Sequence, residues 1–247
     1  DWFYDAVQYA RLNGFFRGTG KTTFEPNGPM TRGMFVTVLG RMAGVNTADY
    51  SGETPFSDVP QSKYYAPYVL WAAKHGITGG TGDGKFSPDA LIDRQQMAAF
   101  FVRYFEAFGV NYETGADIAT TPADLDRVQS YAKDAVLKLW KQGLLNGDGV
   151  NFDPTGNASR AQAATLCMRT DEVVETWYRE PGVASERVRI DLAAGGTVTP
   201  EKPTEPAKPS SGGSSGGSSS GGGTTTTDYH SVSFAMGKDQ TAITLPA

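Results

Sequence analysis

Apolar residues recur at helical spacing in six stretches over about the first 170 residues. In one of them, Tyr65, Val69, Ala72 and Ala73 lie at i, i+4, i+7 and i+8, which is the apolar stripe of an amphipathic helix. The other five stripes are Phe3, Val7, Ala10; Phe35, Val38, Leu39, Met42; Met97, Phe100, Phe101, Tyr104; Ala132, Val136, Leu139; and Ala163, Leu166, Cys167. This pattern predicts an all-α fold.

The six predicted helices form three copies of one helix-loop-helix repeat. Four landmarks identify the copies: Gly14, Phe24, Pro26, Arg32; then Gly76, Phe86, Pro88, Arg94; then Gly143, Phe152, Pro154, Arg160. Units that recur at a fixed period bury their apolar faces by packing on one another. We therefore predict repeats at 1–50, 51–115 and 116–180, packed around one shared core.

Each predicted loop has the same pattern of glycine, phenylalanine and proline residues. Gly14, Gly76 and Gly143 follow the first helices, where a left-handed residue ends a helix without a Cβ clash. A second glycine follows (Gly18, Gly80, Gly147), and the loop closes in Phe-x-Pro. We expect the phenylalanine to anchor the loop in the core.

The second helices begin after Thr31, Asp93 and Ser159, which are residue types that cap a helix N-terminus. Gln96 and Gln162 lie where they could complete a capping box. Met34 occupies that place in the first repeat, so we expect half of the box to be missing there.

The rest of the chain has a different composition. Residues 181–227 become rich in Pro and then in Gly, Ser and Thr, which is typical of a disordered linker. Apolar residues alternate weakly in 228–247, which we interpret as the beginning of a truncated β-type domain. The chain opens inside a repeat, so we expect sequence to precede Asp1.

Composition excludes several classes of function. The net charge of −5 offers no basic field for nucleic acid, and no apolar run approaches the ~20 residues of a membrane span. The single cysteine, Cys167, is expected in the core, and the segment Gly18–Thr22 lacks the first glycine of a P-loop. No carboxylate pair, catalytic triad or metal-ligand cluster recurs. We therefore expect no catalytic residue, no cofactor, no metal and no enzymatic activity.

Two segments and the helix starts carry a resemblance to a known family. They are the F-x-D-V segment Pro55–Pro60, the loop Gly76–Pro88 (G-I-x-x-G-x-x-x-G-x-F-x-P) and the Thr-Arg-like starts at Thr31, Asp93 and Ser159. With its three copies in register, the chain resembles the S-layer homology (SLH) modules of bacterial cell-surface proteins. The resemblance implies a pseudo-threefold helical prism whose inter-repeat grooves hold secondary cell-wall polysaccharide, often with a pyruvylated sugar.

The resemblance also implies ligand-binding residues. An arginine just inside a helix N-terminus brings a guanidinium fork to a place where the helix dipole and free N–H groups favour an anion. Glycines would let loop amides approach a sugar, aromatic rings would face a pyranose, and a carboxylate could bind hydroxyls or cap the following helix. The candidate ligand residues are Arg32, Arg94, Arg160, Gly18, Gly80, Gly147, Trp2, Tyr64, Tyr131 and Asp58.

The sequence thus predicts non-covalent anchoring of an exported protein to cell-wall polysaccharide, outside a Gram-positive cell. One alternative is a helical-repeat module that assembles protein subunits in a surface layer by self-association. A further reading, compatible with anchoring, makes the module the targeting arm of a surface hydrolase.

Overall fold

The computed structural model describes residues 1–20, 22–109, 112, 114, 116–173, 188–191 and 197–200 of the chain. Its helices are α1 (Tyr4–Leu12), α2 (Arg32–Met42), η1 (Thr47–Tyr50), α3 (Ala66–Lys74), α4 (Arg94–Phe108), η2 (Leu125–Arg127), α5 (Ser130–Lys141) and α6 (Arg160–Val173). The strands are β1 (Val188–Asp191) and β2 (Thr197–Pro200). The helices belong to one structural unit and the strands to another, and the predicted all-α class of the repeats is confirmed.

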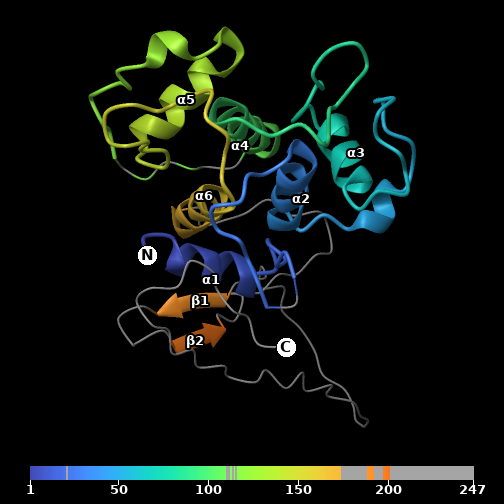
Figure 1. The fold of residues 1–247 in the computed structure, drawn as a ribbon, viewed down its shortest axis with the longest axis horizontal. Coiled ribbons are helices and arrows are strands. Elements are labelled where there is room, and N and C mark those ends of the chain that lie inside the picture. Colours follow the sequence, from blue (N-terminus) through green and yellow to red (C-terminus); the bar gives the residue numbers. More distant parts are fainter. Residues whose placement is uncertain are drawn as a thin grey trace, which may run out of the picture. The chain divides into compact units, whose positions relative to one another are not determined.

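The helices pair between repeats. The second helix of each repeat packs against the first helix of the next one: α2 against α3, α4 against α5, and α6 back against α1 (Figure 1). On the inner side of α2, the ring of Phe35 lies 5.9 Å from that of Phe100 and 5.7 Å from that of Phe101. The three repeats therefore close into the predicted pseudo-threefold ring around one core.

Backbone hydrogen bonds close the same ring. The residue before each helix cap joins its equivalents in a cycle: Met30 N–H donates to Ala158 O (3.0 Å), Ala158 N–H to Ile92 O (2.9 Å), and Ile92 N–H to Met30 O (2.9 Å). Each repeat thus gives one donor and one acceptor to its two neighbours, and the first and third repeats meet although they are far apart in sequence.

The predicted burial of the loop phenylalanines and the predicted glycine helix ends are both confirmed. Phe24, Phe86 and Phe152 are completely buried, and so are Trp71 and Cys167. Gly14, Gly76 and Gly143 adopt left-handed backbone conformations, with φ of 72°, 70° and 67°. Each glycine ends a first helix and turns the chain into its loop.

The predicted N-caps are confirmed, but two of the capping boxes differ from expectation. Thr31, Asp93 and Ser159 each accept a hydrogen bond from a first-turn N–H, and Gln162 completes its box by accepting from Ser159 N–H at 3.0 Å. Gln96 does not complete a box, because its side chain bonds to an arginine of another repeat instead. Met34 was expected to leave the box half empty, yet its sulfur lies 3.5 Å from Thr31 N and takes the acceptor position.

The two strands form an antiparallel pair in which Val188 lies opposite Pro200 and Asp191 opposite Thr197. This pair falls within residues 181–227, the range that the sequence assigns to the linker. The other residues of that range and all of 228–247 lie outside the described residues, so the linker and the truncated β-type domain stay predictions.

Candidate functional site

The arginine at the start of each second helix is buried against the loop of the next repeat. Nε of Arg32 donates to Phe86 O at 2.9 Å, Nε of Arg94 to Phe152 O at 2.8 Å, and Nε of Arg160 to Phe24 O at 2.7 Å. These side chains are only 4%, 8% and 6% exposed. The three predicted arginines therefore have the same geometry, and each bridges two repeats.

Each guanidinium also lies over the ring of the phenylalanine to whose carbonyl it is bonded. The distances from Cζ to the ring centroid are 4.8 Å for Arg32, 5.2 Å for Arg94 and 4.5 Å for Arg160. A cation over an aromatic face at this range is attracted by the ring quadrupole. Burial lowers the pKa of each arginine, but from so high a value that the group stays protonated at neutral pH.

The helix starts do not offer the free N–H groups that we expected for an anion. Arg32 N–H donates to Ala90 O and Gly33 N–H to Pro88 O, both at 2.9 Å, and the other two helix starts are closed in the same way. The neighbouring loop supplies the acceptors that a helix N-terminus lacks. The helix dipole remains, but an anion at this place would be held by the guanidinium rather than by first-turn amides.

The guanidinium groups keep donors for a ligand. Arg32 Nη1 donates to Gln96 Oε1 at 3.0 Å, and Arg160 Nη2 donates to Arg17 O at 2.8 Å. Arg94 makes no further hydrogen bond among the described residues. A guanidinium carries five N–H groups, so three remain on Arg32 and Arg160 after these bonds, and four on Arg94.

These donors face three surface grooves, each named here for the repeat whose loop forms its floor. Groove 1 has a volume of about 230 Å³, groove 2 about 460 Å³ and groove 3 about 210 Å³. Groove 1 is lined by Phe16, Arg17, Gly18, Met30, Met34, Thr37, Val38, Arg41, Tyr64 and Arg160. Groove 2 is lined by Arg32, Thr78, Gly79, Gly80, Thr81, Gln96, Ala99, Phe100, Arg103, Gln129 and Tyr131. Groove 3 is lined by Trp2, Arg94, Met97, Leu144, Leu145, Asn146, Gly147, Gln162, Thr165, Leu166 and Arg169.

All three repeats contribute to every groove. In groove 2, the loop with Gly80 and the side chain of Gln96 come from the second repeat, Arg32 comes from the first, and Tyr131 comes from the third. In groove 3 the loop comes from the third repeat, the arginine from the second and the aromatic ring from the first. In groove 1 the loop comes from the first repeat, the arginine from the third and the aromatic ring from the second. The predicted arginines, glycines and aromatic residues therefore meet only because the ring closes.

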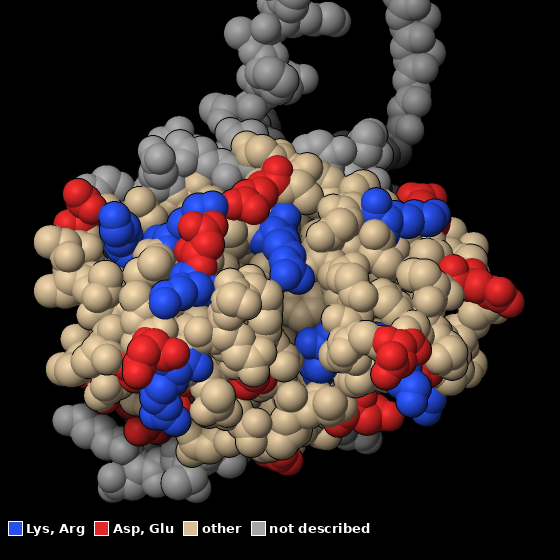
Figure 2. Space-filling model, turned by 90° about the horizontal axis from the view of Figure 1, so that it is seen from above, with Lys and Arg blue, Asp and Glu red and all other residues tan. Residues whose placement is uncertain are grey.

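The charge of the grooves opposes that of the chain. Two arginines line groove 2, two line groove 3 and three line groove 1, while no Asp or Glu is among the described residues that line them. The chain as a whole has a net charge of −5. Figure 2 shows one face of the molecule on which basic and acidic side chains are interspersed. The charged side chains that line the grooves are thus all basic, whereas the face in Figure 2 carries both signs.

The aromatic residues at the starts of the first helices form one wall of each groove. Trp2, Tyr64 and Tyr131 are 66%, 56% and 44% exposed, which is unusual for large apolar rings. Burial raises the pKa of both tyrosines, so their hydroxyls stay neutral at neutral pH and would not repel an anion. Contact of these rings with a sugar stays a prediction.

Gly80 and Gly147 are required first by their own loops. A Cβ on Gly80 would lie 2.3 Å from Lys85 O, and one on Gly147 would lie 1.8 Å from Asn151 O. Both have positive φ, at 81° and 55°. Gly18, Gly80 and Gly147 line grooves 1, 2 and 3, so a ligand would meet bare backbone there.

Asp58 has a different place from the one we expected. Its two carboxylate oxygens accept from Phe86 N–H and Ser87 N–H, each at 2.8 Å, and it lines none of the three grooves. Asp124 does the same for Phe152 N–H at 2.7 Å and Asp153 N–H at 2.8 Å. These carboxylates hold the loops of their own repeats, and the N-terminus of α3 has no side-chain cap, so the expected capping by Asp58 is wrong. Sugar binding by Asp58 stays a prediction.

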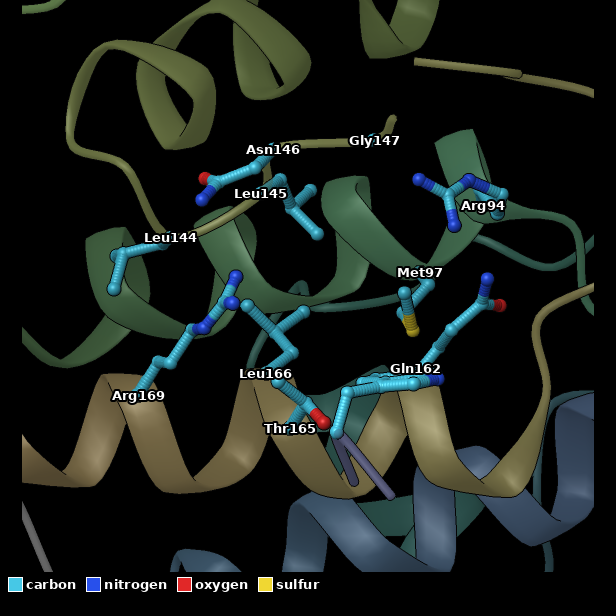
Figure 3. A pocket seen from close by; sticks show the side chains of 11 residues that line it. Arg94, Met97, Leu144, Leu145, Asn146, Gly147, Gln162, Thr165, Leu166 and Arg169 are labelled. Carbon is cyan, nitrogen blue, oxygen red and sulfur yellow. The ribbon is translucent and has the colours of Figure 1, made fainter. Parts of the chain in front are cut away.

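Our sequence reasoning missed a second arginine in each groove. Arg41, Arg103 and Arg169 follow the first arginine of their helix by nine residues in all three repeats. That recurrence was available in the sequence as a signal. Figure 3 shows groove 3, where Arg169 reaches up from α6 toward Leu144 and Leu145, while Arg94 comes from α4 on the other side, near Gly147.

Comparison with known proteins agrees with this architecture. The S-layer homology domain family matches residues 1–33, 55–98 and 123–164. The matched segments cover the loop and the second-helix start of each repeat. Through these three tandem modules the chain belongs to the S-layer homology domain family.

Its relatives are surface proteins and enzymes. It is 34% identical over 168 residues to an amylopullulanase of Thermoanaerobacterium thermosulfurigenes, covering 67% of this chain and 9% of that protein. It is 29% identical over 171 residues to the S-layer protein sap of Bacillus anthracis (69% and 20%), and 26% identical over 162 residues to a cellulosome-anchoring protein of Acetivibrio thermocellus (64% and 35%). The chain thus spans a small part of each relative.

The helices of the described residues were also compared with the length and apolarity of a membrane span, and their side chains with the make-up of a metal site. None of their helices is long and apolar enough to cross a membrane. Groups of three or more His, Cys, Asp or Glu side chains that could hold a metal ion do not occur among them either.

Proposed function

We propose that this chain anchors an exported protein to the cell wall without a covalent bond, by holding an acidic secondary cell-wall polysaccharide in its three grooves. One observation carries the proposal: two or more arginines and no carboxylate line each groove, in a chain whose net charge is −5. Such grooves favour an anion over a neutral ligand.

The chemistry suits a pyruvylated sugar. A pyruvyl ketal places one carboxylate on a ring that otherwise carries hydroxyls. Carboxylates accept bidentate, charge-assisted hydrogen bonds from a guanidinium, and the buried arginine is already fixed before the ligand arrives. Trp2, Tyr64 or Tyr131 offers an apolar face to the pyranose, and Gln96 or Gln162 offers an amide to its hydroxyls.

The family and the relatives support the part of the proposal that concerns anchoring at the cell wall. S-layer homology modules occur in S-layer proteins, in a cellulosome-anchoring protein and in enzymes, which fits an anchor attached to different partners. Such a module works outside the cell, at the cell wall or surface layer. The module itself is an anchor and not a catalyst. We propose that it could carry a hydrolase to the wall, since enzymes are among its relatives.

The test is cosedimentation of the full chain with purified cell walls. Replacing Arg32, Arg94 and Arg160 by Gln removes the charge and keeps a polar side chain. Hydrogen bonds to charged groups contribute about 1.5–3 kcal/mol each, so each replacement should weaken binding by its own groove about 10- to 100-fold. The triple variant should lose wall binding, because avidity multiplies the three losses.

Arg127→Gln is the matched control, since Arg127 is exposed on η2 and lines none of the grooves. Circular dichroism at 222 nm should show that every variant is folded. Walls stripped of polymer by mild acid should no longer bind the unmodified chain. Retained binding by a folded triple variant, or self-association that is independent of the wall, would favour the protein-assembly alternative instead.

A further inference from the structure

The two arginines of each second helix serve different grooves. Nine residues correspond to about two and a half turns of an α-helix, which is roughly 13–14 Å along the axis and half a turn around it. Accordingly, Arg32 of α2 lines groove 2 whereas Arg41 of the same helix lines groove 1. The same holds for Arg94 and Arg103 of α4, and for Arg160 and Arg169 of α6. Each groove therefore receives one arginine from each of two helices.

The two arginines of groove 2 differ in their surroundings, whereas Arg41 of groove 1 is half-buried and donates from Nη1 to Phe15 O at 3.3 Å. Arg32 is buried, and its Nε and one Nη are already hydrogen-bonded, so its charge is fixed in place. Arg103, its companion in groove 2, is exposed. Charge pairs at an exposed site contribute little because water screens them, yet an exposed guanidinium can still donate several hydrogen bonds.

The aromatic wall indicates that both arginines act on the same space. Burial and the negative charge of Asp93 raise the pKa of Tyr131, and the positive charges of Arg32 and Arg103 both oppose that rise. In groove 1, burial and Asp89 raise the pKa of Tyr64, and Arg41 and Arg160 oppose the rise. The hydroxyl on the wall thus lies within the electrostatic range of both guanidinium groups.

We propose that Arg41, Arg103 and Arg169 are a second set of ligand-binding residues, one in each groove, which donate to the hydroxyl or acetamide oxygens of the sugar whose acidic group the buried arginine holds. The inference rests on the proposed function. It assigns two tasks: the fixed arginine selects for charge, and the outer arginine adds affinity for acidic and neutral sugars alike.

Groove 2 gives the sharpest test, because it is the largest and its outer arginine is exposed. The full chain with Arg94→Gln and Arg160→Gln leaves only groove 2 with its buried arginine. Two probes are titrated by calorimetry: an N-acetylhexosamine with a pyruvyl ketal, and the same sugar without it. In this background, Arg103→Ala should weaken binding of both probes about three- to tenfold, and Arg103→Lys should restore part of the loss.

A second background separates ligand contact from a structural role. With Arg32→Gln and Arg160→Gln, only groove 3 keeps its buried arginine, and that arginine, Arg94, lies on the same helix as Arg103. Arg103→Ala should leave binding of the pyruvylated probe unchanged there, since its side chain lines groove 2. An equal loss in both backgrounds would mean that Arg103 only supports α4, and would overturn the inference. Arg127→Ala is the control in both.

The two proposals fail in different ways. If Arg32→Gln removes the preference for the pyruvylated probe in the groove 2 background while Arg103→Ala changes nothing, the anchoring site stands and the second set of residues is wrong. If neither substitution changes the binding of either probe, the grooves are not the polysaccharide site and both proposals fall.

Discussion

The arginine that begins each second helix belongs to the fold as much as to any ligand. Its Nε satisfies a loop carbonyl of the next repeat, and its plane covers the phenylalanine ring beneath. Lysine would supply the charge but not the fork, so Arg→Lys at these places is not a conservative change. The groove acquires a fixed cation because the repeat interface needs that side chain.

Carboxylates in the repeats have the complementary task of holding loops. Asp124 is buried and accepts from two successive loop amides. We expect Asp124→Ala to lower the free energy of unfolding by about 2–3 kcal/mol, because one buried and one half-buried N–H group lose a charged acceptor. Urea denaturation followed by fluorescence measures this change. Asp126→Ala, at an exposed site two residues away, should stay within about 0.5 kcal/mol; equal effects of the two substitutions would refute the loop-holding role.

At the scale of elements, the loop between the two helices of the second repeat contains a tight turn beside the groove floor. Thr81 N–H donates to Lys85 O at 2.8 Å, and Lys85 N–H donates to Gly82 O at 2.9 Å. The turn brings Lys85 O so close to Gly80 that a side chain cannot be placed there. The shape of the groove floor is therefore set by backbone contacts.

Gly80→Ala should destabilise the protein more than Gly84→Ala. Both glycines have positive φ, at 81° and 64°, so each alanine carries the left-handed cost of about 1–2 kcal/mol. A Cβ on Gly84 meets open space, whereas one on Gly80 also meets Lys85 O and the ring of Phe56. We expect a loss of about 1 kcal/mol for Gly84→Ala and about 2–4 kcal/mol for Gly80→Ala, measured by thermal and urea unfolding. Similar losses would show that the loop can move away.

At the scale of the whole molecule, every repeat of the ring packs against both of the others. Each second helix needs the first helix of the next repeat, and the third repeat needs the first. Repeats arranged in an open row can lose a terminal copy and remain folded. A closed ring of three cannot, because removal of one copy exposes two apolar helix faces at once.

We therefore predict that truncation after residue 119, which removes the third repeat, abolishes cooperative thermal unfolding and most helical circular dichroism. Arg94 would lose Phe152 O, and α1 would lose α6. Truncation after residue 180 is the control; it removes only the predicted linker and β-type segment and should leave the transition unchanged. A folded two-repeat protein would show that the ring is not one cooperative unit.

Local features of the sequence predicted the structure correctly where the interacting residues lie close together in the chain. The stripes around Val7, Val69 and Val136 predicted helices whose apolar faces are buried, and the glycines after them ended those helices as expected. The caps at Asp93 and Ser159 bond within their own first turn. These features depend on steric and hydrogen-bonding preferences over a few residues.

The predictions that failed depended on a distant partner. Gln96 could have closed a capping box, but Arg32, which precedes it by 64 residues, engages its side chain instead. Asp58 accepts from amides 28 and 29 residues later in the chain. The free N–H groups expected at the helix starts are bonded to a loop of another repeat. Local sequence rules cannot identify these hydrogen-bond partners, because the partners come within reach only when the ring has formed.

The sequence alone thus determined the repeat, its helices, its caps and the three arginines that recur at their starts, because these follow from local periodicity and residue chemistry. Only the tertiary structure decided that the arginines are fixed on loop carbonyls, that each groove combines three repeats, and that a second arginine enters each groove from a different helix. Contributions from separate repeats meet through ring closure, which is a property of packing between distant segments and not of any one of them.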